Sequence, residues 1–301
     1  MHFRRYAIIK ISHGNSLDFP RFGLARAEAF NCLWFGITGV MAENPFVSII
    51  LPTRNRVPRL NTCIMLLEKN TIGHNYEVVV VFDPDDAETE GWVTAAAKRN
   101  PRIVPVKNPE RRQLVWSANH GVRRSSGQIL ASFMDDVEVE PHWLDEALKC
   151  FRKRFPDGQG FVSLNDGRFG PRFAVVAIVS RSLLQRIYGG DLFYSGYVHF
   201  GGDHEVSDLA RALGRFVYCP KSIAFHNHPD WATKPALWDG TYAEAHPLAN
   251  KDNSLYKQRI RWLFWALHLK RTPADWFYWF RGKFIDLVEL IQRMQKLQSN
   301  G

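Results

Sequence analysis

The sequence contains few cysteines, and their spacing is not that of a metal-binding or disulfide-stapled domain. The 301 residues include four cysteines, which are Cys32, Cys63, Cys150 and Cys219, and no two of them form a C-x-x-C pair. This absence excludes a zinc ribbon and a small secreted scaffold held together by disulfides. It is typical of a protein from a reducing compartment.

The chain also lacks long apolar runs, internal repeats and low-complexity linkers. No stretch reaches the roughly 18 apolar residues that span a bilayer, so we expect no transmembrane anchor. With 46% hydrophobic residues, the chain can nevertheless bury a substantial core as one large domain or two.

Acidic residues are fewer than basic ones. The chain has 39 Lys and Arg against 30 Asp and Glu, which gives a formal net charge of +9. Such a surface attracts anions such as acidic lipid headgroups, nucleic acid or phosphorylated small molecules. Because the basic residues are dispersed and no nucleic-acid-binding motif is present, we expect no nucleic-acid partner.

Residues 1–44 form an N-terminal extension whose role the sequence leaves open. The segment 30–42 is apolar, but it lies too far from Met1 for an ordinary signal peptide. We interpret the extension as a poorly structured leader. Because Met41 directly precedes the first convincing element, we hypothesise that translation naturally starts there, which N-terminal sequencing of natively expressed protein would test.

From residue 46 onward, apolar β-rich runs alternate with segments in which apolar residues recur at helical spacing. Such alternation predicts a doubly wound α/β half with a mainly parallel sheet flanked by helices. The run at 77–82 is continuous enough to be buried on both faces, as strands of parallel sheets are. The expected strands cover 46–51, 77–82, 102–106 and 128–134, and the expected helices cover 56–69, 89–99, 114–124 and 141–155.

The second half of the chain has a more mixed pattern. After Pro229 the composition changes to Trp, Tyr, Lys and Arg, which predicts a C-terminal helical appendage rather than more sheet. Before that point we expect strands at 173–179, 215–218 and 222–226 and helices at 182–188 and 206–213.

Two acidic clusters lie where α/β sheets bind ligands. Asp135 and Asp136 follow the apolar strand at 128–134, and Asp203 and Glu205 open a later helix. The carboxyl ends of strands in an open α/β sheet are the usual position of a ligand. Adjacent carboxylates there repel each other unless protons or a cation neutralise them, which favours a divalent metal ion and transfer chemistry.

Five further motifs follow one another in a fixed order along residues 46–230. They are Val47-Ser-Ile-Ile-Leu-Pro-Thr-Arg-Asn-Arg56, Val81-Phe-Asp83-Pro-Asp-Asp86, Ser117-Ala-Asn119-His-Gly121, Asp203-x-Glu205 with Arg211-Ala-Leu-Gly214, and His226-Asn-His228-Pro229. Each motif alone is weak, but the five in this order resemble the inverting glycosyltransferases of family 2, which have the GT-A fold.

The resemblance implies a GT-A domain, Rossmann-like with a mixed, mainly parallel sheet, over residues 45–230. Within it, 45–136 would be the nucleotide-binding half and 137–230 the acceptor half, followed by a helical, aromatic and basic segment at 231–301. It also implies a nucleotide-sugar donor, by the same resemblance a UDP-sugar, and a hydroxyl acceptor. The residues that it places at the nucleotide are Pro52, Thr53, Asn55, Arg56, Asp83, Asn119 and Asp135.

The same resemblance implies the chemistry of a hexosyl- or glycosyltransferase. Mn²⁺ or Mg²⁺ would neutralise the leaving diphosphate, with Asp136, Asp135 and His226 as the expected ligands. Asp203 would be the general base and Glu205 would position the acceptor, and one base opposite the leaving group implies inversion. The alternatives from local structure are solvated turn residues for the Asp pair and a helix N-cap for Asp203.

Two positions depart from the family pattern. Met134 stands where the first residue of an Asp-x-Asp motif is usual, so it stays open which carboxylate oxygens of Asp135, Asp136 and Glu138 bind metal. The usual Glu-Asp base motif is Gly202-Asp203 here. His226 and His228 alternate on a strand and face one side, and of the two we favour His226 for the active site.

The segment Gln258-Arg-Ile-Arg261-Trp262 fits the QxxRW pattern. It resembles the acceptor-channel motif of membrane-embedded polysaccharide synthases, so Gln258, Arg261 and Trp262 are candidate acceptor residues. The alternative is an amphipathic helix with Trp262 packed against the core. Acceptor specificity would also depend on the loops at 165–172 and 194–200.

Aromatic and basic residues beyond Pro273 are typical of a helix that lies at a membrane surface. We therefore expect a cytoplasmic protein with peripheral contact at the inner face of the membrane and a glycan or lipid-linked acceptor. Packing on the core or pairing with another subunit would explain this segment equally well.

Two other functions fit part of the pattern. A sugar nucleotidyltransferase also needs acidic residues and metal at strand ends. A non-catalytic relative that only binds a nucleotide sugar or a polyanion would explain both departures from the family pattern. The histidine motif and the helix of Asp203 favour the glycosyltransferase.

Overall fold

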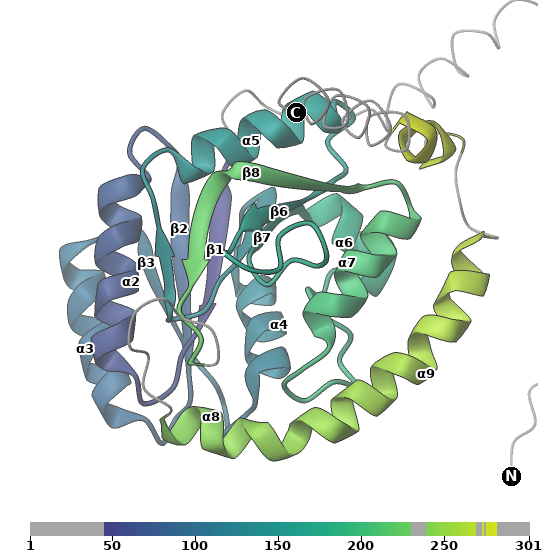
Figure 1. Ribbon diagram of the computed structural model, residues 1–301. Helices are drawn as coiled ribbons and strands as arrows, with labels where there is room; N and C mark the ends of the chain where they lie inside the picture. Colours follow the sequence, from purple (N-terminus) through teal and green to yellow (C-terminus); the bar gives the residue numbers. More distant parts are fainter. Residues whose placement is uncertain (1–44, 230–238, 269–272, 274, 282–301) are drawn as a thin grey trace, which may run out of the picture. The chain divides into compact units, whose positions relative to one another are not determined.

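Helices cover both faces of one eight-stranded sheet in the computed structural model of the chain (Figure 1). The structure describes residues 45–229, 239–268, 273 and 275–281, all within one unit of the chain. The strands are β1 (Val47–Pro52), β2 (Tyr76–Phe82), β3 (Ile103–Lys107), β4 (Ile129–Ser132), β5 (Val137–Val139), β6 (Phe161–Asn165), β7 (Ala177–Ser180) and β8 (Phe216–His226). The helices are α2 (Val57–Asn70), α3 (Ala87–Arg99), α4 (Leu114–Arg124), α5 (Trp143–Arg154), α6 (Arg181–Tyr188), α7 (Gly202–Ala212), α8 (Gly240–Ala245) and α9 (Ala249–His268), with a 3₁₀ turn, η1 (His246–Leu248), before α9.

The sheet has the strand order β3-β2-β1-β4-β7-β6-β8-β5, so the direction in which successive strands are added reverses beside β1. The chain moves outward from β1 to β2 and β3 and then returns past β1 to β4, and all four strands are parallel. Because such crossovers are almost always right-handed, α4 lies on the opposite face from α2 and α3. The carboxyl ends of β1 and β4 therefore flank the crevice where doubly wound sheets bind ligands.

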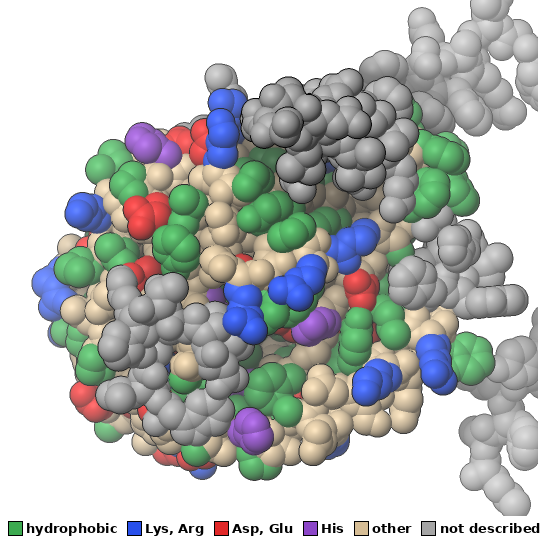
Figure 2. Space-filling view, viewed as in Figure 1, with side chains coloured by type: hydrophobic (Ala, Val, Ile, Leu, Met, Phe, Trp, Pro, Cys, Tyr) green, Lys and Arg blue, Asp and Glu red, His purple; other side chains and the backbone are tan. Residues whose placement is uncertain are grey.

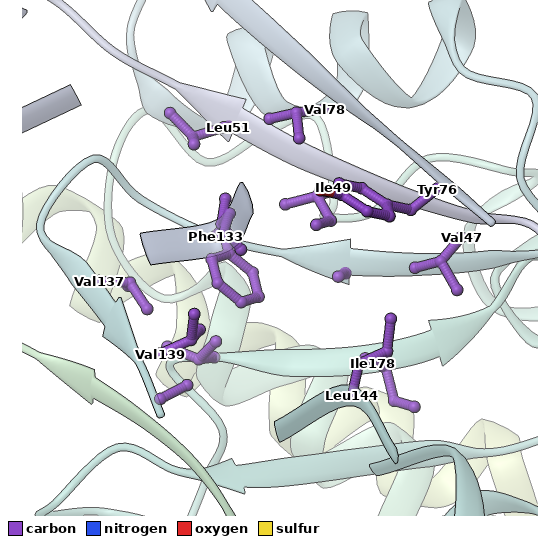
Figure 3. Close-up of a cluster of buried hydrophobic side chains, with 14 of the residues drawn as sticks. Val47, Ile49, Leu51, Tyr76, Val78, Phe133, Val137, Val139, Leu144 and Ile178 are labelled. Atoms are coloured by element: carbon purple, nitrogen blue, oxygen red, sulfur yellow. The ribbon is translucent and has the colours of Figure 1, made fainter. Parts of the chain in front are cut away.

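The two faces of the sheet bury separate hydrophobic clusters. Helices α2, α3 and α5 cover the first cluster, part of which is seen in Figure 3 with Ile49, Phe133 and Ile178. Helices α4, α6 and α7 cover the second, to which β1 contributes Ile50. Ile49 and Ile50 enter opposite clusters because successive strand side chains point to opposite faces. This two-sided burial is why β1 is apolar apart from Ser48, whose buried hydroxyl donates to Glu77 at 2.6 Å.

The predicted mixed, mainly parallel sheet flanked by helices is confirmed, but the second half differs in detail. The strands expected at 215–218 and 222–226 are one strand, β8, which pairs first with β6 and then with β5. Strands β5 and β6 were not predicted. β5 has only 3 residues, and the apolar pattern of β6 is interrupted by buried Ser163, whose hydroxyl donates to the Gly170 carbonyl.

The last residues that the structure describes are fixed to the sheet by buried ion pairs. Asp275 is fully buried and accepts hydrogen bonds from Arg215 Nε at 3.0 Å and from Arg186 Nη2 at 2.7 Å. The Arg215 guanidinium also lies 4.2 Å from the centre of the Tyr278 ring. Nearby aromatic side chains remain exposed, namely Trp276, Phe277 and Phe280.

None of the helices that the structure describes combines the length and apolar character needed to span a bilayer. Most of the aromatic, basic segment expected at 273–301 lies outside the described residues, so the peripheral membrane contact stays a prediction. The extension at 1–44, with the hypothesis about Met41, also lies outside them.

Two glycines in helices make a matched test of how closely α4 packs on the sheet. A Cβ atom on Gly121 would lie 2.8 Å from Val81 Cγ2 and 2.9 Å from Ile50 Cγ2, whereas one on Gly91 would meet nothing within 4 Å. Val and Ile are stiff at χ1, so these methyl groups yield poorly. We expect Gly121→Ala to lower the free energy of unfolding by about 1–3 kcal/mol, and Gly91→Ala to raise it by about 0.5–1 kcal/mol. Urea denaturation measures both, and equal effects would contradict the close packing.

Candidate active site

A cavity of about 390 Å³ opens at the carboxyl ends of β1, β2 and β4, where the reversal in strand order predicts a ligand. Figure 2 shows basic and histidine side chains gathered near the middle of one face of the molecule. The structure brings many of the predicted site residues to this one cavity. Those that line it are Pro52, Thr53, Arg56, Asp83, Asp135, Asp136, Asp203 and His226.

Asp135 is held by the connection between β1 and α2. Its Oδ2 accepts a hydrogen bond from the Thr53 hydroxyl at 2.7 Å, and its Oδ1 accepts one from Arg56 Nη1 at 3.2 Å. Pro58 lies in the first turn of α2, where its fixed φ suits a helix start directly after Arg56. Both oxygens of Asp135 therefore face protein donors of the neighbouring strand connection.

Asp136 is held from the other side, by residues far along the chain. His226 Nε2, at the end of β8, lies 3.2 Å from Asp136 Oδ1. The Tyr242 hydroxyl of α8 donates a short hydrogen bond to Asp136 Oδ2. Arg59 Nη1 lies 3.7 Å from the same Oδ2. Asp136 is thus the meeting point of β4, β8, α2 and α8.

Burial and pairing shift the ionisation of this cluster in opposite directions. Burial raises the pKa of Asp135 to about 6, against the opposing effect of Arg56. Burial acts in the same sense on Asp136, but its contacts with His226, Tyr242 and Arg56 outweigh burial and hold its pKa below the usual range. Burial lowers the pKa of His226, yet Asp136 outweighs it, so the pKa is raised. The pairing of Asp136 with His226 therefore favours the charged form of each side chain.

Asp83 follows β2 and forms a second polar centre in the cavity. Its Oδ1 accepts hydrogen bonds from Asn108 Nδ2 at 2.8 Å and from the Arg112 backbone N–H at 3.1 Å, and its Oδ2 accepts one from Arg54 Nη1 at 3.1 Å. Arg54 also pairs with exposed Asp85 at 2.6 Å. A carboxylate with spare lone pairs, fixed by three donors, can accept from a nucleobase or ribose.

Asp203 lies in the first turn of α7 and lines the same cavity as Asp135 and Asp136. It is close enough to His226 to help raise the pKa of that imidazole. The N-cap of α7 is not Asp203 but Gly201, which has φ +83°, a conformation that favours glycine. The N-cap alternative for Asp203 is therefore wrong.

The departure at Gly202 has a steric cause. A Cβ atom on Gly202 would lie 2.8 Å from Cγ and Cδ1 of the Phe193 ring. The aromatic ring fills the place where the usual glutamate side chain would start. Phe193 also lines the cavity, so the lost carboxylate is replaced there by an apolar wall.

Glu205 has a different position from the one expected for an acceptor-binding group. It is fully buried, and it is not among the residues that line the cavity. Its oxygens accept hydrogen bonds from the Tyr188 hydroxyl at 2.8 Å, the Tyr197 hydroxyl at 2.7 Å and Arg259 Nε at 2.8 Å. This arrangement favours a role in fixing α7, and so Asp203, rather than direct contact with a substrate.

Asn119 also has a different position from the predicted nucleotide contact. Its Oδ1 accepts from the backbone N–H groups of Leu192 and Phe193, each at 3.0 Å, and its Nδ2 donates to the Phe193 carbonyl at 2.9 Å. It does not line the cavity. Asn55 is likewise outside the cavity lining, is exposed with φ 53°, and donates its backbone N–H to Asp86.

The QxxRW residues lie on the outer face of α9 and do not line the cavity. Gln258 and Arg261 are exposed, and Trp262 is 80% exposed, so the packed alternative for Trp262 is wrong, while the acceptor role of the three residues stays a prediction. The residue between them, Arg259, faces inward to Glu205. The helix periodicity therefore puts the inward contact at a wildcard position of the motif.

Several residues in or behind the cavity wall were not predicted individually, although some lie in the loops expected to bind the acceptor. Fully buried Asp252 of α9 accepts hydrogen bonds from the backbone N–H groups of Val198, His199 and Phe200. Burial lowers the pKa of His199 to about 4, against the opposing effect of Asp252, so the imidazole is neutral. An aromatic wall is formed by Phe169, Phe173, Phe200 and His204.

The divalent cation implied by the resemblance has a partial set of ligands. Among the residues that the structure describes, no three His, Cys, Asp or Glu side chains are grouped to hold a metal by themselves. Asp136 Oδ1 accepts no hydrogen bond within the described chain, although His226 is adjacent. One carboxylate and one imidazole fit a hard cation that takes further oxygen ligands from a diphosphate and water. Asp136 and His226 suit the cation better than Asp135, whose oxygens are engaged.

Comparisons with known proteins agree with this architecture. Residues 48–189 match the family model described as glycosyl transferase family 2. A solved mannosyltransferase from Pyrobaculum calidifontis, in complex with GDP-Man and Mn²⁺, superposes with a TM-score of 0.52 at 17% identity, over 91% of this chain and 95% of that one. The GT-A fold that the sequence predicts is thereby confirmed.

Two further matches are more limited. The chain is 32% identical over 184 residues to an uncharacterised protein of Sinorhizobium fredii, which is 58% of this chain but only 18% of that protein. The solved TarS fragment 1–349 of S. aureus matches with a TM-score of 0.49 at 14% identity, over 62% of this chain and 61% of that one. The chain thus spans less than a fifth of the curated relative that it matches.

The position of Asn119 makes a testable prediction about stability. In Asn119→Leu the backbone groups of Leu192 and Phe193 lose their partners, and each buried group left unpaired costs about 1–3 kcal/mol. We expect a loss of several kcal/mol in urea denaturation, whereas Asn61→Leu on the exposed face of α2 should change stability by less than about 0.5 kcal/mol. An unchanged stability together with weakened nucleotide binding would instead support the predicted nucleotide contact.

Proposed function

We propose that the chain, whose residues 48–189 match the family model of glycosyl transferase family 2, moves a sugar from a nucleotide-sugar donor to a hydroxyl acceptor. The observation that supports this most directly is the single cavity shared by Asp83, Asp136 and Asp203. In this proposal Asp83 contacts the nucleoside, Asp136 faces the diphosphate and Asp203 faces the acceptor. The reaction is a single displacement with inversion at the anomeric carbon.

The leaving diphosphate gains negative charge as the glycosidic bond breaks. A divalent cation, Mn²⁺ or Mg²⁺, would supply electrostatic stabilisation of that charge when bound. Asp136 and His226 would hold it, and Arg56, which is 9% exposed, adds a fixed positive charge in a site of low dielectric. Asp135 keeps Arg56 in place through its hydrogen bond at 3.2 Å.

Asp203 is the proposed general base. Its carboxylate would accept the proton of the acceptor hydroxyl as that oxygen attacks, a role worth about 10²–10⁴-fold in rate. The residue is half-buried at the start of α7. Glu205 and Arg259, bonded at 2.8 Å, keep this helix in position.

Asp83 supports a UDP-sugar donor. A carboxylate oxygen accepts from N–H and O–H donors such as those of a uracil ring or a ribose. Asp83 is 2% exposed and fixed by Asn108 and Arg112, so it offers a preorganised acceptor in the cavity wall. A thermal-shift screen of nucleotide sugars would identify the donor sugar, because a nucleotide sugar that binds the folded protein raises its melting temperature.

The aromatic wall supports a glycan acceptor, including one linked to a lipid. The rings of Phe169 and Phe173 lie 4.4 Å apart, and that of Phe173 stacks on His204 at 3.7 Å. Asp166 fixes this loop, because its Oδ1 accepts from the backbone N–H of Arg168, Phe169 and Gly170. Flat aromatic faces beside the proposed base suit the apolar C–H face of a sugar ring.

A sugar nucleotidyltransferase would need acidic residues and metal but no general base for an acceptor hydroxyl. Asp203 in the shared cavity therefore favours the glycosyltransferase. A relative that only binds nucleotide sugars or polyanions would bind the donor without turnover. Release of nucleoside diphosphate from the identified donor, measured with Mn²⁺, separates the binder from the enzyme.

Asp203→Asn tests the proposed base. We expect kcat for transfer or donor hydrolysis to fall by at least about 10²-fold, because an amide cannot accept the proton, with donor affinity within about twofold of wild type. Asp208→Asn is the matched control, since Asp208 is on the same helix but pairs with Arg211 at 3.0 Å and does not line the cavity. Equal turnover of Asp203→Asn and wild type would remove Asp203 as base. A product that keeps the donor's anomeric configuration by NMR would contradict single displacement.

The Asp pair offers a test of metal binding. Asp136→Asn should weaken Mn²⁺ binding in the presence of nucleoside diphosphate by about tenfold or more, because a ligand oxygen is lost. Asp135→Asn should chiefly lower the melting temperature, because Arg56 loses a buried partner, with a smaller effect on Mn²⁺ affinity. Calorimetric Mn²⁺ titration and thermal denaturation check both, and the reverse pattern would assign the cation to Asp135.

A further inference from the structure

The carboxylate of Asp239 lies between two arginines beside the cavity. Asp239 Oδ1 is 2.8 Å from Arg56 Nη2, and Asp239 Oδ2 is 3.5 Å from Arg59 Nη2. One anion that bridges two guanidinium groups is the arrangement that arginines also make with phosphates. The sequence motifs included Arg56 but gave no indication of Arg59 or Asp239.

The same two arginines also lie close to the carboxylate of Asp136. Arg56 Nη1 lies 3.9 Å and Arg59 Nη1 lies 3.7 Å from Asp136 Oδ2. Tyr242 donates its hydroxyl to that same oxygen, and its ring lies 4.2 Å from the Arg56 guanidinium. The arginines, Asp136 and the first turn of α8 therefore form one compact polar cluster.

Asp239 and Tyr242 are fixed to each other by the cap of α8. The Asp239 carboxylate is the N-cap and accepts hydrogen bonds from the backbone N–H groups of Thr241 at 3.1 Å and Tyr242 at 3.2 Å. Thr241 in turn donates its hydroxyl to the Arg54 carbonyl at 3.2 Å. The start of α8 thus places an anion on the arginines and a hydroxyl on Asp136 at the same time.

The charges of this cluster match the exchange of one anion for another. Two positive side chains, Arg56 and Arg59, pair with three carboxylates. Asp135 and Asp136 follow β4, whereas Asp239 belongs to the separate segment that starts α8. Arg56 is 9% exposed, and within the described chain its Nε has no hydrogen-bond partner, so the guanidinium retains capacity for an oxygen ligand. A phosphate oxygen in place of the Asp239 carboxylate would keep both arginines neutralised.

We infer that Arg56 and Arg59 form the binding site for the donor's diphosphate, and that Asp239 and Tyr242 hold this site closed until a diphosphate displaces them. The assignment of a nucleotide-sugar donor rests on the proposed function, but the site itself would take any diphosphate. Displacement of α8 frees Asp136 Oδ2 from Tyr242 at the moment when the diphosphate arrives. The first turn of α8 is thus an internal competitor for the donor.

Calorimetric titration of the full-length protein with inorganic pyrophosphate tests this inference without an identified donor. We expect Asp239→Asn to bind pyrophosphate about tenfold more tightly than wild type, because the competing charge is removed, and Arg59→Gln to bind it about tenfold more weakly. Asp191→Asn is the matched control. Asp191 pairs with Arg123 at 2.6 Å, away from the cavity, so this variant changes the net charge equally but should leave the affinity unchanged.

A thermal melt of each variant distinguishes competition from a merely structural ion pair. If Asp239 only stabilises the fold, Asp239→Asn lowers the melting temperature and leaves pyrophosphate affinity unchanged or weaker, which overturns the inference. Absence of pyrophosphate binding in both wild type and Asp239→Asn also overturns it. Arg59→Lys should recover part of the affinity lost in Arg59→Gln, and equal loss in both would point to misfolding of the site rather than to a lost phosphate contact and would also count against it.

The same data separate this inference from the proposed function. Pyrophosphate affinities as expected, with no turnover of any nucleotide sugar, would leave the diphosphate site standing and remove the transferase. Turnover of a nucleotide sugar, with pyrophosphate affinity insensitive to Asp239 and Arg59, would leave the transferase standing and remove the closed diphosphate site.

Discussion

Two adjacent carboxylates buried at the reversal of strand order are the constraint around which the site is built. Buried charges persist only where partners compensate the loss of water. Asp135 obtains its partners, Thr53 and Arg56, from the connection after β1, and Asp136 obtains His226 from β8 and Tyr242 from α8. Segments more than a hundred residues apart therefore converge on one point. The buried carboxylate of Asp135 requires a positive partner, and this partner, Arg56, thereby lies where its charge would also stabilise a phosphate.

The parallel half of the fold follows from local sequence because each of its signals is local. A continuous apolar run marks a strand buried on both faces, and helical spacing marks the crossover after it, so β1 to β4 and α2 to α4 were predictable. Polar residues directly after those strands, such as Asp83 and Asp135, had to meet at one edge of the sheet. The second half, where parallel and antiparallel pairs mix, lacks such signals, since β5 is 3 residues long and Ser163 interrupts β6.

The residues that sequence reasoning misplaced are those whose partners are distant backbone groups or helices. Asn119 and Glu205 belong to motifs, but their polar atoms face Phe193 and Arg259, which no pattern in the sequence connects to them. Arg59 and Asp239 meet only because α8 returns to the start of α2. Gly202 shows the converse case, in which a missing carboxylate is explained by the ring of Phe193 that occupies its place.

The hydrogen bonds of Asp252 decide how far the chain can be shortened from its C-terminal end. Its carboxylate lies in α9 but accepts the backbone N–H groups of residues 198–200, just before Asp203. A fragment that stops at residue 230 would leave those N–H groups without acceptors and Glu205 without Arg259, at a desolvation cost for each. The family match ends at residue 189, yet residues of α9 provide buried partners for the segment around Asp203. The contacts that fix the site thus continue well beyond the edge of the recognised sequence family.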